Sequence, residues 1–234
     1  PREQLVSTLK TLRDVPERST LWVNGDGIEA LEYGGDRSGG LRDLVVDPAA
    51  VQIVVRRRCH FRIELRDPAM ADVVADSDAA IVIAHSLAEP RQQHPLPHYD
   101  DVASEVAAFL RQRVELALAR GIPPERIIID PGHDLNKNTL QTLELTRRLD
   151  EIAALGYPLL VALSNKDFIG ESLGRARDER VAGSLAAAVF SVLHGARIVR
   201  AHNVPETVDA LRMVEAILGW RVPGDLVHNM RAEG

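Results

Sequence analysis

Residues 127–138 read IIIDPGHDLNKN, a run of isoleucines that ends on a charged residue and then turns. The isoleucines predict a short buried strand, because β-branched side chains pack well on a pleated sheet. Asp130 follows the last isoleucine, and the proline and glycine after it are typical of a turn. The stretch therefore places a carboxylate at the carboxyl end of a predicted strand.

Two later segments repeat this order. PLLVALSNKDFIGESLG (158–174) presents Lys166 after its apolar run, and ARIVRAHNVPET (196–207) presents Arg200 and His202. Two-residue alternation places Arg200 and His202 on one face of the last strand. Charges at the ends of successive strands converge only if the strands are parallel, with their carboxyl ends on one side, and barrel enzymes build active sites in this way.

Strands and helices alternate from about residue 79 onward. Residues 101–120 predict a helix, because their apolar side chains keep the i, i+4, i+7, i+8 spacing of one face. These side chains are Val102, Val106, Phe109, Leu110, Val114 and Ala117. Further helices are predicted over 139–155, over 178–194 and around Leu211, Val214 and Leu218, and strands over 79–85, 126–130, 158–164 and 196–202. Apolar strands separated by amphipathic helices indicate a parallel sheet covered by helices.

The predicted fold class is α/β, a TIM (β/α)8-type barrel. Polar groups spread over several consecutive strands favour a closed barrel over an open sheet. Residues 1–234 are interpreted as a single domain, although a complete barrel takes about 250 residues. We therefore expect the front half to be shortened or degenerate. It offers a weaker pattern, with a possible helix at 2–13, strands at 20–24 and 41–46, and several glycines between them.

Composition limits the classes of function. The chain has 45% apolar and 26% charged residues, which is typical of a globular protein. No apolar run approaches the length of a membrane span, and no signal segment opens the sequence. The single cysteine, Cys59, excludes an internal disulfide framework and favours a buried thiol in a reducing compartment, so we expect a cytoplasmic protein. A net charge of −6 argues against broad contact with nucleic acid, and the run 56–58 of arginines is interpreted as a solvated helix end.

Three other motifs have simpler interpretations. Gly25–Ala30 fits the loose dinucleotide pattern G-x-G-x-x-G/A, but Asp26 would set an anion beside a pyrophosphate, so the match is disfavoured. His94 and His98 have the spacing of helical metal ligands, yet the prolines between them exclude the helix and indicate a loop. His85 ends its strand and either faces the polar edge or sits in the core.

From about Asp67 to Gly219 the chain resembles the dihydropteroate synthase family. The shared motifs, in order, are DPAMADVVAD (67–76), IVIAH (81–85), HYDDVASEV (98–106), IDPG (129–132), SNK with FIGESLG (164–174) and GSLAAAVFSVLHGARIVRAHNV (183–204). The form ALSNKD, with Asn165 where most members have arginine, is similar to a divergent second copy found beside the main enzyme in some actinobacteria.

The resemblance implies a reaction and a pterin site. The family joins a dihydropterin diphosphate to para-aminobenzoate and releases diphosphate. Asp130 matches the carboxylate that accepts two adjacent N–H groups of the pterin, a geometry that carboxylates provide well. Lys166 matches the lysine that donates to the pterin carbonyl and ring nitrogen, and the resemblance assigns Asn165, beside it, to the pterin site as well. Ser164 lies where the family holds para-aminobenzoate.

The resemblance also implies a diphosphate site. Arg200 and His202 match the groups that hold the leaving diphosphate, at the last strand end, where barrels often bind phosphate. Magnesium shares that charge in the family, so Mg²⁺ is implied as a cofactor, although its protein ligands stay unassigned. Members pair through their last helices, so a homodimer is expected.

The chain departs from the family pattern at several places. HDLNK (133–137) stands where the family reads glycine-phenylalanine-glycine-lysine, and Asn203 replaces an aspartate after the histidine. Asn165 cannot lay a guanidinium plane over the pterin. The front half has only distant counterparts of three loops that the family uses: VNGDG (23–27), EYGGDRSGG (32–40) and Asp47. No site residue is assigned in the front half.

Two hypotheses follow. The first is an active dihydropteroate synthase-type transferase that acts on the pterin diphosphate and para-aminobenzoate with magnesium. The second is a paralogue that binds a pterin or an anion without turnover, favoured by Asn165 and the altered loop 133–137. A third and weaker hypothesis is a pterin-dependent methyltransferase. That reaction needs no diphosphate site, so the presence of Arg200 and His202 disfavours it.

Overall fold

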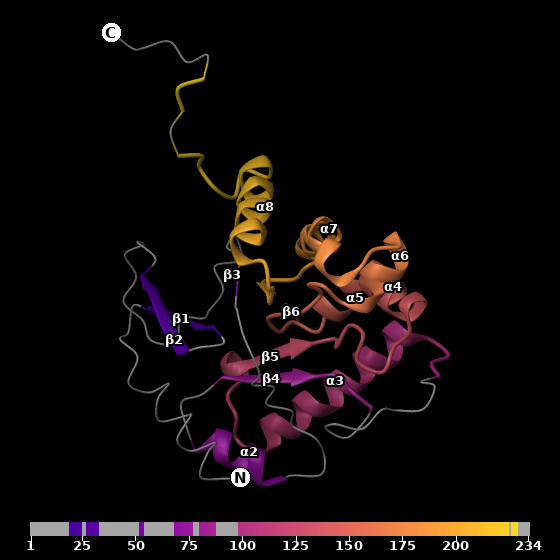
Figure 1. Cartoon of the computed structure of the whole chain (residues 1–234). Helices are drawn as coiled ribbons and strands as arrows, with labels where there is room; N and C mark the ends of the chain where they lie inside the picture. The colour runs from indigo at the N-terminus through magenta and orange to yellow at the C-terminus, as the bar shows by residue number, and fades with distance from the viewer. Residues whose placement is uncertain are drawn as a thin grey trace.

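Short strands and helices follow each other along most of the described chain (Figure 1). A computed structural model describes residues 19–24, 27–32, 52–53, 68–76, 80–87, 98–224 and 226–228. The strands are β1 Ser19–Asn24, β2 Gly27–Glu32, β3 Gln52–Ile53, β4 Ile81–Ala84, β5 Ile127–Asp130, β6 Leu160–Val161 and β7 Ile198–Val199. The α-helices are α2 Pro68–Ala75, α3 Val102–Ala119, α4 Thr139–Arg147, α5 Leu149–Ala153, α6 Asp167–Leu173, α7 Val181–Leu193 and α8 Val204–Ile217. The features predicted at 2–13, 41–46, Asp47, 56–58, Cys59 and His94 lie outside the described residues.

The strands β3 to β7 are parallel. β4 pairs with β5, β6 with β7, and β7 with β3, while a parallel bridge between Ile129 and Leu159 joins β5 to β6. The resulting order is β4-β5-β6-β7-β3, so their carboxyl ends share one side. The α/β class and the parallel strands are therefore confirmed. Closure into an eight-stranded TIM-type barrel with a shortened front half stays a prediction, because most of the first 67 residues are not described.

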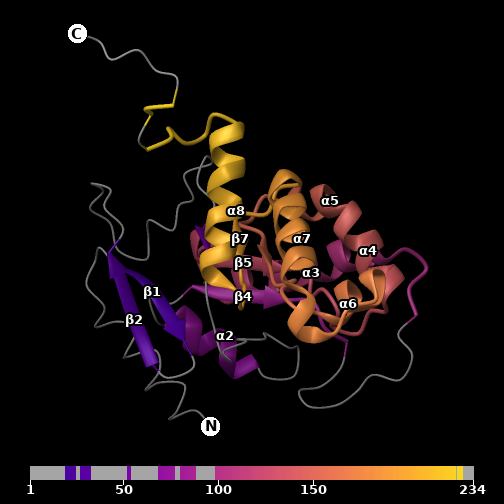
Figure 2. The ribbon, with the colours of Figure 1, turned by 45° about the horizontal axis from the view of Figure 1, so that its top comes forward.

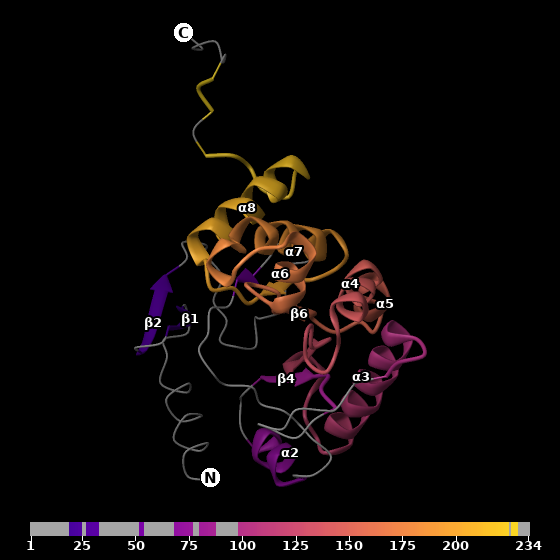
Figure 3. The ribbon, with the colours of Figure 1, turned by 45° about the vertical axis from the view of Figure 1, so that its right-hand side comes forward.

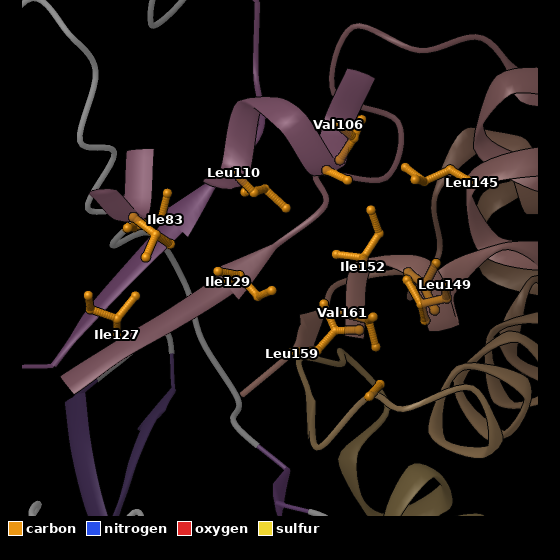
Figure 4. Packing of buried hydrophobic residues seen from close by; sticks show 14 of the residues in the cluster. Ile83, Val106, Leu110, Ile127, Ile129, Leu145, Leu149, Ile152, Leu159 and Val161 are labelled. Atoms are coloured by element: carbon orange, nitrogen blue, oxygen red, sulfur yellow. The ribbon is translucent and has the colours of Figure 1, made fainter. Parts of the chain in front are cut away.

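The core lies between β4, β5 and β6 and the helices α3, α4 and α5. Figure 4 shows isoleucines from the strands pointing toward leucines and valines of the helices. The largest of these side chains are fully buried: Ile83, Leu110, Ile127, Ile129, Leu145, Leu149, Ile152 and Leu159. Each such side chain contributes about 1.5–3 kcal/mol relative to an exposed one. This packing holds the strand ends at fixed positions.

The helices agree with the periodic pattern except at one place. α3 and α7 are confirmed within a few residues of their predicted ends, and α8 is confirmed as the helix that contains Leu211 and Val214. Five of the six residues assigned to the inner face of α3 are buried. The predicted helix 139–155 is divided at Arg148, whose backbone has φ −105° and ψ 28°. The Arg148 guanidinium binds Asp101 at 2.8 Å and Glu151 at 2.6 Å, which ties the division to the start of α3. α2 and α6 were not predicted by periodicity, since both are short.

β1 and β2 form an antiparallel hairpin in which Ser19 pairs with Glu32. The hairpin is a two-stranded sheet of its own, seen to the left of β4 and β6 in Figures 1 and 3. An antiparallel strand at Gly27–Glu32 stands where a dinucleotide fingerprint requires a helix, so that interpretation of Gly25–Ala30 is excluded. Within the described ranges, no helix has the length and apolar character needed to cross a membrane.

Candidate functional site

The polar residues singled out in the sequence come together at the carboxyl ends of the parallel strands. Asp130 ends β5, Lys166 follows β6, and Arg200 and His202 follow β7. The Lys166 ammonium interacts electrostatically with Asp130 and with Arg200, and His202 interacts with Arg200 and Lys166. Parallel strands with a common direction produce this convergence from segments that are 30 or more residues apart.

Asp130 is held by the turn that follows it. Its side chain is buried, and its Oδ1 accepts a hydrogen bond of 2.8 Å from the Gly132 N–H. Gly132 has φ +66°, and a Cβ there would lie 2.0 Å from the carbonyl oxygen of His85. Only glycine allows the chain to turn this closely against the end of β4. Among the described residues, the other carboxylate oxygen of Asp130 accepts no hydrogen bond.

Lys166 immediately precedes α6, and its Nζ donates to the carbonyl oxygen of His133. Burial, opposed by Asp130 and Asp134 and assisted by Arg200, lowers the pKa of Lys166 to about 8. At neutral pH the side chain is therefore still mostly a cation. It is a hydrogen-bond donor beside the Asp130 carboxylate.

Lys137 was not singled out from the sequence, although it lies in the loop after Asp130. Its ammonium is buried and contacts His85 Nδ1 at 2.9 Å, Gly132 O at 3.0 Å and Leu135 O at 3.1 Å. Burial, followed by the charge of Lys166, lowers its pKa to about 7. Burial and the Lys137 charge lower the pKa of His85 to about 3, so His85 is a neutral, buried partner of Lys137. The sequence feature that could have indicated this residue is the lysine of HDLNK, in the loop that follows Asp130.

The altered loop 133–137 keeps a conformation that glycine favours. Asp134 and Asn136 have φ values of 60° and 53°, in the left-handed region that asparagine and aspartate tolerate better than other side chains. Asn136 Oδ1 accepts from Ser86 Oγ at 2.9 Å and from the Leu87 N–H at 2.8 Å. Tyr99 OH donates to the Asn136 carbonyl at 2.9 Å. The loss of small residues is therefore accommodated, and the loop is bound to the end of β4.

His133, in the same loop, is fully buried. Neither ring nitrogen has a hydrogen-bond partner among the described residues. Burial, with Lys166 and Lys137 nearby, holds the pKa of His133 well below its usual value, so the ring is neutral. It lies near the two lysines without adding a third positive charge.

Ser164 and Asn165 connect the end of β6 to the end of β7. Ser164 Oγ accepts a hydrogen bond of 3.2 Å from the His202 N–H and lies 3.2 Å from His202 Nδ1. Asn165 Nδ2 donates to Asn203 Oδ1 at 3.3 Å. Desolvation, with Arg177 and Arg200, lowers the pKa of His202. At neutral pH the His202 ring is therefore mostly uncharged, and it lies beside Arg200.

The described residues do not by themselves form a metal site. Within the described ranges, no three side chains of His, Cys, Asp or Glu cluster closely enough to hold an ion. His98, exposed and 3.1 Å from Asp100, belongs to no such group.

The fold and the site define a class: a parallel-stranded α/β protein that presents one buried carboxylate and several cations at its strand ends. The family model described as "Pterin binding enzyme" matches residues 59–202. The chain is 36% identical over 154 residues to dihydropteroate synthase of Escherichia coli K12, and the match covers 66% of this chain and 55% of that protein. It is 40% identical over 173 residues to "Inactive dihydropteroate synthase 2" of Mycobacterium tuberculosis, covering 70% of this chain and 53% of that protein. The chain belongs to the dihydropteroate synthase family.

Solved structures agree. Dihydropteroate synthase from Stenotrophomonas maltophilia gives a TM-score of 0.65 at 37% identity, covering 74% of this chain and 63% of the other. The Xanthomonas albilineans enzyme in complex with 7,8-dihydropteroate gives 0.61 at 41% identity, covering 68% and 59%. The chain thus spans between half and two thirds of these relatives.

Proposed function

We propose that the chain binds a dihydropterin diphosphate and joins it to para-aminobenzoate, as a dihydropteroate synthase-type transferase of the cytoplasm. The convergence of Asp130, Lys166, Arg200 and His202 at neighbouring strand ends carries this proposal. One carboxylate beside one lysine suits the donor and acceptor edge of a pterin. Two basic side chains at the next strand end suit a diphosphate.

In the proposed pterin site, Asp130 accepts two adjacent N–H groups from the pterin. Lys166 donates to the pterin carbonyl and ring nitrogen, for which its ammonium must be protonated. Because Asp130 is buried, each hydrogen bond to its charge contributes about 1.5–3 kcal/mol. Asn165 borders this site beside Lys166.

In the proposed reaction, the amine of para-aminobenzoate attacks the methylene carbon of the pterin. A carbon–nitrogen bond forms, the carbon–oxygen bond to the diphosphate breaks, and the nitrogen loses one proton. Arg200 holds the departing anion as a cation and His202 as a neutral ring that can donate an N–H. Preorganised groups of this kind contribute several kcal/mol to such a barrier. Ser164, which already contacts His202, would lie on the para-aminobenzoate side.

We propose magnesium as an ion that enters with the diphosphate. The described residues contain no cluster of three metal-ligating side chains. Magnesium commonly binds through substrate phosphates and a few protein ligands. Its contribution would be to share the negative charge of the diphosphate with Arg200.

The second candidate is a paralogue that binds the ligand without turnover. Asn165 offers no guanidinium plane to the pterin, and its side-chain amide donates to Asn203 instead. Relatives of comparable similarity from mycobacteria carry the name "Inactive dihydropteroate synthase 2".

Calorimetry with dihydropterin diphosphate, with and without magnesium, tests the binding proposal. A turnover assay with para-aminobenzoate then separates the two candidates, because steady release of diphosphate supports the transferase. Tight binding without product supports the paralogue. Absence of binding under both conditions would reject the pterin site itself.

We also propose a homodimer formed through α7 and α8. These helices pack side by side (Figure 2). Leu193 of α7 is 52% exposed, and Met213 and Ile217 of α8 are 59% and 70% exposed. A second copy that covers these apolar side chains would remove them from water.

A further inference from the structure

Each polar group of Asn165, in the backbone and in the side chain, takes part in a hydrogen bond. Its backbone N–H donates to Ser184 Oγ at 2.9 Å, and its carbonyl accepts from Arg180 Nη1 at 3.1 Å. Its Oδ1 lies 3.3 Å from Ser184 Oγ, and its Nδ2 donates to Asn203 Oδ1 at 3.3 Å. With φ +57°, the residue sits in a left-handed turn that asparagine tolerates. The side chain is therefore held in one orientation, toward Asn203.

Asn203 occupies the N-cap position of α8 but does not use its side chain as a cap. An asparagine at this position usually accepts a hydrogen bond from the backbone N–H of the second or third helical residue. Here there is no such bond, and a proline stands at the helix start, where it removes one backbone donor. The Asn203 side-chain oxygen accepts from Asn165 instead.

The two asparagines join the same strand ends that carry the proposed ligand groups. Asn165 immediately precedes Lys166, and Asn203 immediately follows His202. One residue earlier on each side, the His202 N–H donates to Ser164 Oγ, so two adjacent links run between the end of β6 and the end of β7. Two hydrogen bonds thus join the segment that carries Lys166 to the segment that carries Arg200 and His202.

We propose that Asn165 and Asn203 act together as positioning residues, an uncharged amide clasp that fixes the separation between Lys166 and the Arg200–His202 pair. This inference rests on the proposed function, because it assigns the pterin to Lys166 and the diphosphate to Arg200 and His202. A ligand that carries both groups needs the two subsites at one fixed separation. Its affinity depends on that geometry in the way that a linked ligand depends on the spacing of two sites.

The binding test compares three ligands: dihydropterin diphosphate, the free hydroxymethyl-dihydropterin and inorganic diphosphate. In Asn203→Ala and in Asn165→Gly, affinity for the linked ligand should fall about tenfold, equivalent to roughly 1.4 kcal/mol. In Asn203→Ala, affinity for each separate fragment should change less than about twofold, because each fragment uses one subsite. In Asn165→Gly, which borders the pterin site, affinity for inorganic diphosphate should likewise change less than about twofold. Glycine is used at 165 because it adopts the left-handed turn without strain. Equal losses for all three ligands would overturn the positioning role.

A thermal double-mutant cycle tests the clasp without any ligand. Each single variant should lower the melting temperature by about 2–4 °C, and the double variant Asn165→Gly/Asn203→Ala by no more than the larger single loss. Asn203→Asp keeps an oxygen that accepts from Asn165 Nδ2 and should retain the melting temperature. Additive losses would overturn the clasp. If the wild-type protein binds none of the three ligands, the proposed function fails, and this cycle alone decides whether the clasp exists.

Discussion

At the scale of single residues, Asp130 and Arg200 have separable tasks. Asp130→Asn keeps an oxygen for the Gly132 N–H but replaces a charged acceptor with an amide, which cannot accept both pterin donors. We expect the affinity for free pterin to fall at least about tenfold, from a loss of about 1.5–3 kcal/mol.

Arg200→Ala should lower the affinity for inorganic diphosphate far more than the affinity for free pterin. Calorimetry with free pterin and with inorganic diphosphate measures both affinities in each variant. If a variant loses equal affinity for the two ligands, the role assigned to its residue is wrong.

Gly132 is the residue whose substitution the backbone tolerates least near the site. In Gly132→Ala the new Cβ would lie 2.0 Å from His85 O, and φ +66° would add strain. The ends of β4 and β5 must then separate, so we expect a loss of at least about 2 kcal/mol in unfolding free energy. Urea denaturation measures it. Gly121→Ala, also at positive φ but with open space around it, is the matched control and should lose less.

The buried ammonium of Lys137 predicts an unusual dependence of stability on pH. The pKa of Lys137 is about 7 in the folded protein, against 10.5 for an ordinary lysine, so between these pH values the unfolded chain binds more protons. Stability should therefore rise with pH over this window, by up to about 1.4 kcal/mol per pH unit, and the burial penalty is fully present below pH 7. Lys137→Met removes the titrating group. Denaturation at pH 7, 8 and 9 should show a steeper rise in the wild type; parallel curves would contradict the assignment.

At the scale of elements, the start of α4 controls the loop that carries Lys137. Asn138 Oδ1 accepts from the Gln141 N–H, and Gln141 Oε1 accepts from the Asn138 N–H, both at 2.9 Å. Asn138→Ala should cost about 1 kcal/mol of unfolding free energy, because the first turn loses its cap. Asn138→Asp keeps the acceptor and should stay close to the wild type. Chemical denaturation of the three proteins checks this, and an equal loss in both variants would exclude the cap as the cause.

The elements also show why periodicity succeeded and where it failed. α3 was predicted within one residue at each end, because a long amphipathic helix repeats its apolar face several times. α6, seven residues long, offers less than two full turns of pattern. The division between α4 and α5 arises from Arg148 and its carboxylate partners, one of which lies 47 residues away in sequence. Local periodicity contains no information about such a contact.

At the scale of the whole molecule, the exposed face of α7 and α8 predicts an association. We expect Ile217→Glu with Met213→Glu to convert a dimer into a monomer, since charges on both sides of a symmetric interface repel and lose water. Sedimentation velocity measures the result. Leu140→Glu, on α4 and 77% exposed, is the control and should leave the assembly unchanged. A wild-type protein that sediments as a monomer at high concentration would reject the dimer.

The sequence by itself determined the class of fold, the parallel direction of the strands and the residues at their ends. These features depend on the local order of apolar runs, turns and charges, which is visible along the chain. Only the tertiary structure decided that Lys137 is buried against His85, that Asp134 and Asn136 take the place of glycines, and that Asn165 binds Asn203 rather than a neighbour. These contacts join residues up to 52 positions apart, and their energies depend on burial and distance, which only the folded packing establishes.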